Sequence, residues 1–373
     1  MRSRQVQYMY RKELVNLVGE LLGIVSMKNL CIFTLYDELG ASSQYRAYIF
    51  REELEKNFNI KWYAFWDNNY VTKYMHNKKK YILQIAFQYI CAYFRRWYQL
   101  NFIATRSDVV FIQKGIIPRI QSTFLKKIKN KGIKIVFDVD DAVYTMHRDN
   151  SALIAKEADC VICGNDTLKA YYSKFNKNCV TIPTIENTLM YEPYWSNTFD
   201  SKVIGWIGSK TTIDNFDLII DALNWITSRH PEVKIHIISN TALDYTTKIN
   251  NAYLFQWEPS SYINDISRFS IGIMPLKDNE INRGKCGFKL IQYLNMKKPV
   301  IASGVGVNGE IVEGNGIVAN TEDEWIAAIE KLLYDRDYYD DCVKHIEGVF
   351  FDTYHFSKVA QQLLKIIDGT NIC

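Results

Sequence analysis

Two lysines beside a Gly-rich turn form the most suggestive chemical pattern in the chain. The stretch NRGKCGFKLIQYLNMKKPVIAS, residues 282–303, contains Lys285 and Lys289 at the start of an amphipathic segment. If residues 285–296 are helical, these lysines and Gln292 lie close to one face, and N–H groups at the helix start could bind a phosphate. A surface helix with solvated lysines is the simpler interpretation of this stretch alone.

A further lysine follows an expected strand in the run GWIGSKTTIDNF. Here Gly208 allows close approach of a ligand, Ser209 offers a hydroxyl, and Lys210 could reach an anion where a helix begins. Another strand ends in YLFQWEPSSY, where Trp257 and Glu258 could contact a nucleobase or a ribose. Because the lysines of these stretches are expected at one edge of one sheet, they predict a pyrophosphate site.

Three carboxylates are crowded at the end of an expected strand in the first half, in the run FDVDDAVY. Asp138, Asp140 and Asp141 could hold sugar hydroxyls, act as a general base, or orient Arg and Lys side chains. Helix capping is the alternative, although three carboxylates exceed what a cap needs. We expect no metal site, because further Asp, Asn or Glu ligands at fixed spacing are not evident.

A turn of small residues follows the first expected strand. Gly40, Ala41, Ser42 and Ser43 lead into a helix and could receive a phosphate or a sugar hydroxyl, and Arg46 one turn later could add a positive charge. The turn is neither a G-x-G-x-x-G fingerprint nor a P-loop. An ordinary strand-to-helix turn also explains it.

Short apolar strands alternate with helical segments along the whole chain. Expected strands lie at 29–36, 60–65, 108–113, 133–138, 159–163 and 180–183, then at 202–207, 233–239, 253–257, 270–274, 299–302 and 316–318. Helical segments include 43–57, 116–130 and 166–175. This alternation predicts an α/β fold with two doubly wound parallel-sheet domains joined near 186–201. In such folds ligands bind beyond the carboxyl ends of the strands.

Length and composition agree with two globular domains. The chain has 373 residues, of which 48% are hydrophobic. Residues 1–200 hold 28 Lys and Arg against 19 Asp and Glu, with basic groups at 78–80, at 95–96 and between 126 and 131. Among long apolar runs and without a nucleic-acid-binding motif, this charge favours an amphipathic helix on an anionic membrane, and no nucleic acid. A helix packed on its own domain is the alternative.

The chain shows no sign of a membrane-spanning segment or a zinc site. No run of 18 or more uncharged apolar residues occurs. Residues 1–26 are an added amphipathic helix, or translation begins at Met27; the pattern leaves both open. The eight cysteines are mostly scattered, and Cys160 and Cys163 have no second pair, so we expect all to be reduced in a cytoplasmic protein.

These motifs together resemble the GT-B glycosyltransferases, and specifically glycosyltransferase family 4. The strongest match is GKCGFKLIQYLNMKKPVIASGVGVNGEIV, which resembles the donor-binding helix, strand and loop of that family. VIGWIGSKTT, IGIMPL, ASSQYR and FDVDDA resemble a subgroup of bacterial polysaccharide-assembly transferases. The resemblance extends from about residue 28 to the C-terminus. It implies two Rossmann-like domains that face a central cleft.

The resemblance also implies domain bounds and roles. An N-terminal extension would occupy 1–27, the acceptor-binding domain 28–190, the nucleotide-sugar domain 201–352, and a helix crossing back to the first domain 353–373. The predicted donor-binding residues are Gly208, Ser209, Lys210, Trp257, Glu258, Lys285, Cys286, Gly287, Phe288, Lys289 and Gln292. The predicted acceptor-binding residues are Ser43, Arg46 and Asp138, and the predicted catalytic residues are Asp140 and Asp141, beside the transferring sugar.

One departure from the family pattern concerns the donor sugar. Many members carry two glutamates eight residues apart, at positions that are Gly284 and Gln292 here. Gln292 can still exchange hydrogen bonds with ribose hydroxyls. Gly284 has no side chain, so the sugar contact must come from elsewhere, with Asp278 and Glu280 as candidates.

The resemblance implies sugar transfer from a nucleotide-sugar to a saccharide or lipid-linked acceptor in surface polysaccharide biosynthesis. The configuration would be retained, and neither a cofactor nor a metal is expected, because lysines and a helix start stabilise the leaving diphosphate. The enzyme would be cytoplasmic, peripheral at the inner face of the membrane. A nucleotide-sugar epimerase of the same architecture and a non-catalytic partner subunit are the alternatives.

Overall fold

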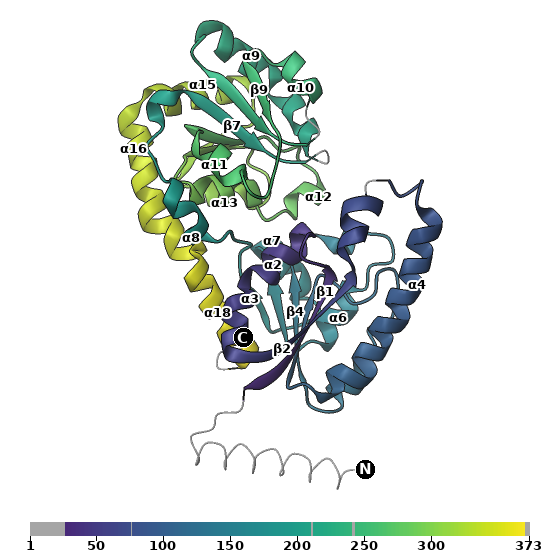
Figure 1. The fold of residues 1–373 in the computed structure, drawn as a ribbon. Coiled ribbons are helices and arrows are strands. Elements are labelled where there is room, and N and C mark those ends of the chain that lie inside the picture. Colours follow the sequence, from purple (N-terminus) through teal and green to yellow (C-terminus); the bar gives the residue numbers. More distant parts are fainter. Residues whose placement is uncertain (1–26, 76, 210–211, 241–242, 370–373) are drawn as a thin grey trace.

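The computed structural model describes residues 27–75, 77–209, 212–240 and 243–369. The expected N-terminal extension and the candidate donor residue Lys210 lie outside these ranges. Figure 1 shows two α/β lobes, one above the other, with the helical segment 336–368 running along one side of both. Each expected strand is present within the described residues.

The first domain is built on a six-stranded parallel sheet in the order β2-β1-β3-β4-β5-β6. Its strands are β1 Lys28–Tyr36, β2 Phe58–Trp66, β3 Val109–Gln113, β4 Lys134–Val139, β5 Cys160–Cys163 and β6 Cys179–Thr181. All residues of β3 and β5 are buried. Continuous apolar runs of this kind form strands whose two faces are both covered by helices.

The second domain repeats this architecture with the order β12-β11-β10-β7-β8-β9. Its strands are β7 Val203–Ile207, β8 Lys234–Ile238, β9 Ala252–Phe255, β10 Ile271–Met274, β11 Val300–Ala302 and β12 Gly316–Val318. All strand pairs in both sheets are parallel, which confirms the predicted α/β fold of two doubly wound domains.

Helices connect the strands in both domains. They are α2 Ala41–Arg46, α3 Arg51–Asn57, α4 Ile82–Tyr98, α5 Lys126–Lys129, α6 Ser151–Glu157, α7 Asp166–Tyr172, α8 Thr188–Tyr191, α9 Ile220–Arg229, α10 Leu243–Lys248, α11 Tyr262–Ser267, α12 Glu280–Arg283, α13 Phe288–Asn295, α14 Asn308–Val312, α15 Glu322–Tyr334, α16 Arg336–His345, α17 Phe351–Tyr354 and α18 Phe356–Asp368. Short 3₁₀ or π segments lie between several of them.

Three predicted helices are wrong in extent. The segment 43–57 divides into α2, a 3₁₀ turn and α3. Of the segment 116–130 only α5 is helical, since Pro118 disfavours a helical residue before it and Phe124 has φ 56°. The segment expected at 285–296 begins only at Phe288, because Gly287 before it is left-handed, with φ 62°.

The C-terminal helix α18 belongs to the first domain by its packing. Its buried side chains, including Val359, Leu363 and Ile367, join the cluster on the outer face of the first sheet. Phe356 at its start stacks on Phe50, with ring centroids 5.7 Å apart. The chain therefore returns from the second domain and covers a face of the first sheet, as the resemblance implies.

Two further expectations can be compared with the structure. Among the described residues, no helix is long and apolar enough to cross a membrane. Cys160 is disulfide-bonded, so the expectation that all cysteines are reduced is wrong at this position. The spacing of cysteines along the chain could not show which of them the fold brings together. The described free thiols are Cys31, Cys91, Cys163, Cys179, Cys286 and Cys342.

Candidate active site

A polar cluster lies where β1, β3 and β4 end. The side chain of Ser42, on α2, donates to Asp140 with both carboxylate oxygens at 2.8 Å. Gln113, the last residue of β3, donates from Nε2 to Ser42 Oγ at 2.8 Å. The ammonium of Lys114 pairs with Asp141 and lies 3.9 Å from Asp140. The predicted catalytic carboxylates thus share one nearly buried lysine.

The local environment shifts the pKa values of Asp140 and Asp141 in opposite directions. Burial raises the pKa of Asp140, although the nearby ammonium of Lys114 opposes the shift. Burial acts in the same direction on Asp141, but Lys114 and Lys285 together hold the pKa of Asp141 below its usual value. Two neighbouring carboxyl groups with opposite shifts can divide proton-holding and charge-stabilising roles between them.

The predicted acceptor-binding residues form hydrogen bonds and an ion pair with other groups of the first domain. Arg46 makes a two-pronged pair with Asp138, at 3.0 Å from Nε and 2.5 Å from Nη2, and donates to the carbonyl of Ile182 at 2.9 Å. Ser43 donates to Gln113 at 2.9 Å. Arg46, Asp138 and Ser43 are all buried. This network fixes α2 on the sheet, and direct contact of these residues with an acceptor stays a prediction.

The loop before α13 contacts the first domain directly. Asn165, the cap of α7, donates to the carbonyls of Gly284 and Lys285 at 3.4 and 3.2 Å. The thiol of Cys286 lies 2.7 Å from the carbonyl oxygen of Asp140. The predicted donor-binding loop and the strand end that bears the predicted catalytic carboxylates are therefore in contact across the two domains.

Gly284 is a point of close approach between the domains. A Cβ atom added there would lie 2.5 Å from the Cβ of Ala142, in the first domain. Cβ atoms do not come this close, so a glutamate at this position is incompatible with the domain arrangement seen here. This contact gives a physical reason for the departure from the family pattern at Gly284.

The two described lysines of the candidate donor site lie in different local structures. Lys285 is in the loop and Lys289 in the first turn of α13, so the expectation of a shared helix face is wrong for Lys285 and holds only for Lys289 and Gln292. Burial lowers the pKa of Lys285, with Asp141 opposing the shift. Burial and the charge of Lys285 lower the pKa of Lys289 to about 7.

Gly208 makes room for Lys289. A Cβ at Gly208 would lie 2.5 Å from the Trp206 ring and 2.9 Å from Cε of Lys289. The Lys289 ammonium lies 5.7 Å from the Trp206 ring centroid. Within the described ranges no carboxylate forms an ion pair with Lys289, so its charge is available to an anion.

Of the remaining predicted donor residues, Gln292 contacts a second buried carboxyl group, that of Glu186. Trp257 stacks on Tyr262, with ring centroids 6.1 Å apart, and Glu258 beside it is exposed. Gln292 is buried and donates from Nε2 to Glu186 at 2.9 Å. Burial raises the pKa of Glu186 to about 7, against hydrogen bonds from Gln292 and neighbouring tyrosines. The amide nitrogen of Gln292 therefore already donates a hydrogen bond within the protein.

The candidates for a replacement sugar contact lie near the domain boundary. Asp278 is exposed and pairs with Arg283 at 2.6 Å. Glu280, at the start of α12, is also exposed and raises the pKa of Tyr144 in the first domain, where burial is the larger cause. Both carboxylates are therefore on the surface, and their roles stay predictions.

Sequence reasoning did not select four residues of this region: Ser42, Gln113, Lys114 and Glu186. Gln113 and Lys114 stand at the end of an expected strand, so the rule that selected Asp140 could have found them. Ser42 lies in the turn of small residues at 40–43, but only its neighbour Ser43 was predicted to bind the acceptor. Glu186 lies in a segment without periodicity and gave no signal.

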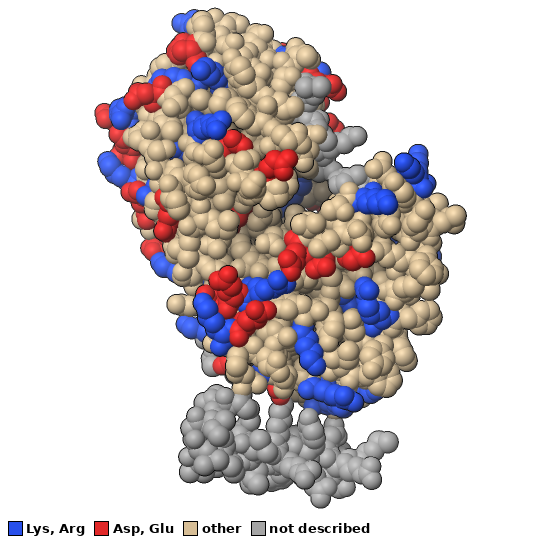
Figure 2. All heavy atoms as spheres, in the orientation of Figure 1, with Lys and Arg blue, Asp and Glu red and all other residues tan. Residues whose placement is uncertain are grey.

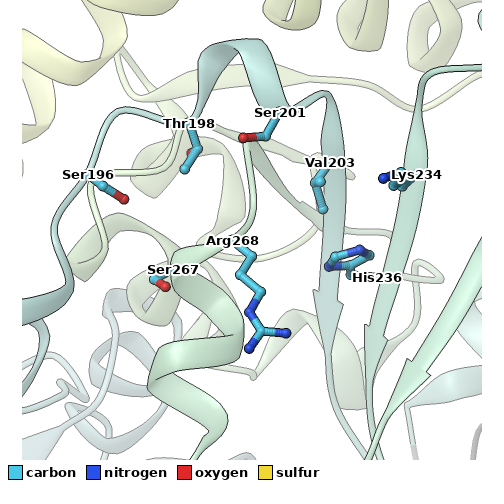
Figure 3. Close-up of a pocket in the computed structure, with 8 residues that line it drawn as sticks. All are labelled: Ser196, Thr198, Ser201, Val203, Lys234, His236, Ser267 and Arg268. Atoms are coloured by element: carbon cyan, nitrogen blue, oxygen red, sulfur yellow. The ribbon is translucent and has the colours of Figure 1, made fainter.

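A cavity of about 490 Å³ in the second domain is separate from this cluster. Figure 3 shows its lining, which includes Val203 and Lys234, the first residues of β7 and β8, together with His236 and Arg268. It opens at the amino ends of these strands, whereas Lys285 and Lys289 follow the carboxyl end of β10 in the same sheet. Among the described residues, no group of three His, Cys, Asp or Glu side chains is arranged to hold a metal ion.

Comparison with known proteins agrees with this geometry. Residues 201–335 match the family model described as glycosyl transferases group 1. A search of curated proteins found no match. The structure of a mutant of S. aureus TarM, in complex with fondaparinux, α-GlcNAc-glycerol and UDP, has 14% identity and a TM-score of 0.52, and covers 70% of this chain. This chain covers 55% of TarM's length.

Other similar structures cover nearly the whole chain. The lipopolysaccharide outer core galactosyltransferase WaaB, in its apo form, has 11% identity and a TM-score of 0.59, covering 92% of this chain and 100% of its own. The UDP-GlcNAc 2-epimerase from Neisseria meningitidis, bound to UDP-GlcNAc, has 12% identity and a TM-score of 0.57, with 91% and 99% covered. At these identities the likeness shows the fold.

Two doubly wound parallel-sheet domains in contact with each other are the architecture of the GT-B class, which the similar structures share. Within that class, residues 201–335 of the second domain match the family model of group 1 glycosyltransferases. The chain therefore has the GT-B fold that its resemblance predicted.

Proposed function

We propose that this protein is a glycosyltransferase that moves a sugar from a nucleotide-sugar to a saccharide or lipid-linked acceptor in surface polysaccharide biosynthesis. The observation that carries the proposal is the position of Lys285 and Lys289, at the head of α13 and across from Asp140 and Asp141. Cations at a helix start suit a diphosphate, and carboxylates opposite them suit a sugar that gains positive charge.

The proposed chemistry follows from the charges that the reaction creates. As the bond between sugar and diphosphate breaks, negative charge grows on the leaving phosphate and positive charge on the ring. Lys285, Lys289 and N–H groups at the start of α13 stabilise the first, so the proposal needs no metal. Asp141, whose pKa is low, stabilises the second. Attack from the face of the leaving group retains configuration and needs no protein nucleophile.

The acceptor and its location form the finer part of the proposal. A lipid-linked acceptor would lie at the inner face of the cytoplasmic membrane, where the basic first domain would bind the anionic surface. Closure of the two domains around the donor would exclude water and limit hydrolysis. The contact between the donor loop and the first domain supports such a closed state.

An epimerase is the second candidate, because the epimerase from Neisseria has the same fold over nearly the whole chain. The two functions differ in their products. A transferase with a suitable acceptor releases a nucleoside diphosphate and forms a glycosidic bond, whereas a 2-epimerase inverts one carbon of the sugar. Product analysis by NMR after incubation with UDP-GlcNAc distinguishes them.

Nucleotide binding by the purified protein tests the proposed donor site. UDP is the first probe, since the TarM structure contains it. Lys289→Ala should weaken UDP affinity roughly 10- to 100-fold, because a hydrogen bond from a charged donor is lost. The matched control is Lys331→Ala on α15, outside the site, which should bind as the wild type does. Titration calorimetry with UDP and with a panel of other nucleoside diphosphates measures both.

The affinity should also depend on pH through Lys289. Its pKa of about 7 in the free protein means that it is charged below pH 7 and increasingly neutral above. A bound diphosphate favours the charged form, so UDP affinity should weaken by up to about tenfold per pH unit above 7. Lys289→Ala should lose this dependence. Equal affinity and pH dependence in wild type and variant would exclude Lys289 from the phosphate site.

A further inference from the structure

Helix α4 exposes a row of large apolar side chains on the first domain. We define the α4 face as Leu83, Phe87, Ile90, Phe94, Trp97 and Phe102. Leu83 is 79% exposed, Phe87 71% and Phe94 63%. Their spacing of three to five residues puts them on one side of the helix and its continuation. A soluble monomer rarely exposes a contiguous apolar patch of this kind without a binding role.

The opposite side of α4 holds the helix firmly in place. Ala92 is buried in the first-domain core, and Ile85, Tyr89 and Tyr93 pack against it. Arg96 is buried and donates to the carbonyls of three different segments, at 2.9 to 3.0 Å. The α4 face is therefore presented by a well-packed helix, and its exposure does not come from a poorly packed element.

Basic side chains flank the α4 face. Residues 68–137 contain 14 Lys and Arg and one acidic residue, Asp108, although Lys114 and Lys134 lie away from α4, and Asp67 accepts a hydrogen bond from Gln88 of α4. Lys78, Lys79 and Lys80 directly precede α4, and all three are exposed. At the other end, Lys127 lies 4.8 Å from the ring centroid of Phe102. Basic groups thus stand at both ends of the apolar row.

Figure 1 shows α4 along the outer edge of the first domain, away from α18 and from the second domain. In Figure 2 this flank is largely tan, without a cluster of red groups. The α4 face is therefore clear of both the domain contact and the candidate active site.

We infer that the α4 face inserts into the interface of an anionic lipid bilayer. Phe and Trp side chains enter the boundary between headgroups and acyl chains, and lysines at both ends contact anionic headgroups. A second copy of the chain is a poorer occupant, because a symmetric contact would bring the same lysines together.

The inference deepens the proposed function, on which it rests for the nature of the acceptor. It assigns the membrane contact to one helix of the predicted acceptor-binding domain. The second domain takes no part in this contact and stays free to close over a donor. A lipid-linked acceptor would then reach the site from the surface to which α4 is bound.

Vesicle co-sedimentation of the full chain tests the inference. The probes are phosphatidylcholine vesicles with and without phosphatidylglycerol. The wild type should bind the mixed vesicles and bind the neutral ones much more weakly. Phe87→Ser with Phe94→Ser should weaken partition at least about tenfold, since two large apolar side chains no longer enter the bilayer. The matched control is Leu153→Ser with Phe175→Ser, two exposed side chains elsewhere on the same domain.

A variant with three lysines replaced tests the electrostatic part of the membrane contact. Lys78→Glu, Lys79→Glu and Lys80→Glu together should weaken binding to the mixed vesicles roughly tenfold or more and leave binding to neutral vesicles little changed. UDP affinity, measured without vesicles, should be the same in every variant. If the wild type does not bind UDP but does bind the mixed vesicles, that result contradicts the proposed function and not the membrane contact of α4.

Three outcomes would overturn the inference. The wild type could fail to sediment with either vesicle, or the double Phe variant could bind as well as the wild type. Light scattering could also show a dimer that the Phe variant dissociates, without any vesicle binding. In that last case the α4 face is an interface between two copies of the chain.

Discussion

At the scale of single residues, Lys114 balances the charge of the candidate active site. It is nearly buried, pairs with Asp141, and lies 3.9 Å from Asp140. Burial acts to lower its pKa, but the two aspartates raise it above the ordinary value. Lys114 also has a left-handed backbone, with φ 66°, which turns the chain at the end of β3. Its ammonium therefore holds together two carboxylates that would otherwise repel each other.

Removal of this ammonium should be costly. Lys114→Met should destabilise the protein by about 2 kcal/mol or more, because it leaves the buried carboxylate of Asp140, beside the half-exposed Asp141, without its counter-charge. In the variant the folded-state pKa values of both aspartates rise, so the loss should grow as pH rises above about 4. Urea denaturation at pH 5 and pH 8 measures this.

The control for this prediction is a second substitution in the same pair. Lys114→Met with Asp141→Asn removes one charge of each sign and should recover much of the lost stability. If Lys114→Met alone is as stable as the wild type at pH 8, the ammonium does not have the balancing role assigned to it.

At the scale of elements, the loop before α13 joins the two domains. It contributes carbonyls to Asn165 and the Cys286 thiol to the backbone of Asp140, and then turns into the helix at Gly287. One short loop therefore connects the predicted leaving-group site to the predicted catalytic carboxylates. Its fit depends on the missing side chain at Gly284.

A methyl group at Gly284 should separate the domains without unfolding either one. Gly284→Ala would place its Cβ 2.5 Å from the Cβ of Ala142, so the closed contact must open. We expect glycosyl transfer to fall at least about tenfold, because the near-attack geometry depends on such contacts, with UDP affinity changed much less.

Gly309→Ala is the matched control for this element. A Cβ at Gly309, in α14, would meet nothing within 4 Å. It should leave transfer unchanged, measured by release of nucleoside diphosphate from a nucleotide-sugar. Equal rates in the Gly284 and Gly309 variants would show that the loop contact does not matter to turnover.

At the scale of the whole molecule, Glu186 lies where the two domains and their connection meet. It follows the first sheet in sequence and accepts a hydrogen bond from Gln292 of the second domain. Tyr262 lies 3.4 Å from the same carboxylate oxygen, and the Tyr45 ring of the first domain packs on Phe288 at 4.3 Å. This buried carboxyl group is therefore part of the domain contact.

The stability of the protein should depend on pH through Glu186. Its folded-state pKa of about 7 lies above the ordinary 4.5, so the folded state holds a proton that the unfolded chain releases. The resulting stability is complete below pH 4.5 and is lost as pH rises through 7. Glu186→Gln should thus match the wild type near pH 4.5 and be more stable at pH 8, by about 3 kcal/mol at most.

Thermal unfolding of both proteins between pH 4.5 and pH 8 measures this difference. Glu258→Gln, an exposed change in the same region, is the control and should not alter the pH dependence. A difference between Glu186→Gln and wild type that stays constant over this range would contradict a raised pKa at Glu186.

The strands of this fold could be predicted from short runs of the sequence. Runs such as VVFIQ and CVIC are apolar throughout, and such runs form strands covered on both faces. The residues that follow parallel strands then meet at one edge, which is why Asp140, Lys285 and Lys289 could be selected as candidates before any contact was known. Helix extents were less certain, because single left-handed residues such as Gly287 and Phe124 ended or prevented them.

The sequence by itself determined the two parallel sheets, the edges where chemistry is expected, and the residue types found there. Only the tertiary structure decided which of these residues face one another. In the structure, Arg46 pairs with Asp138 inside the first domain, and Lys114 lies between Asp140 and Asp141. Gly284 packs against Ala142 of the other domain. The physical reason is range: strand patterns depend on neighbours along the chain, whereas ion pairs and domain contacts join residues far apart in sequence, and many different pairings are compatible with the same local pattern.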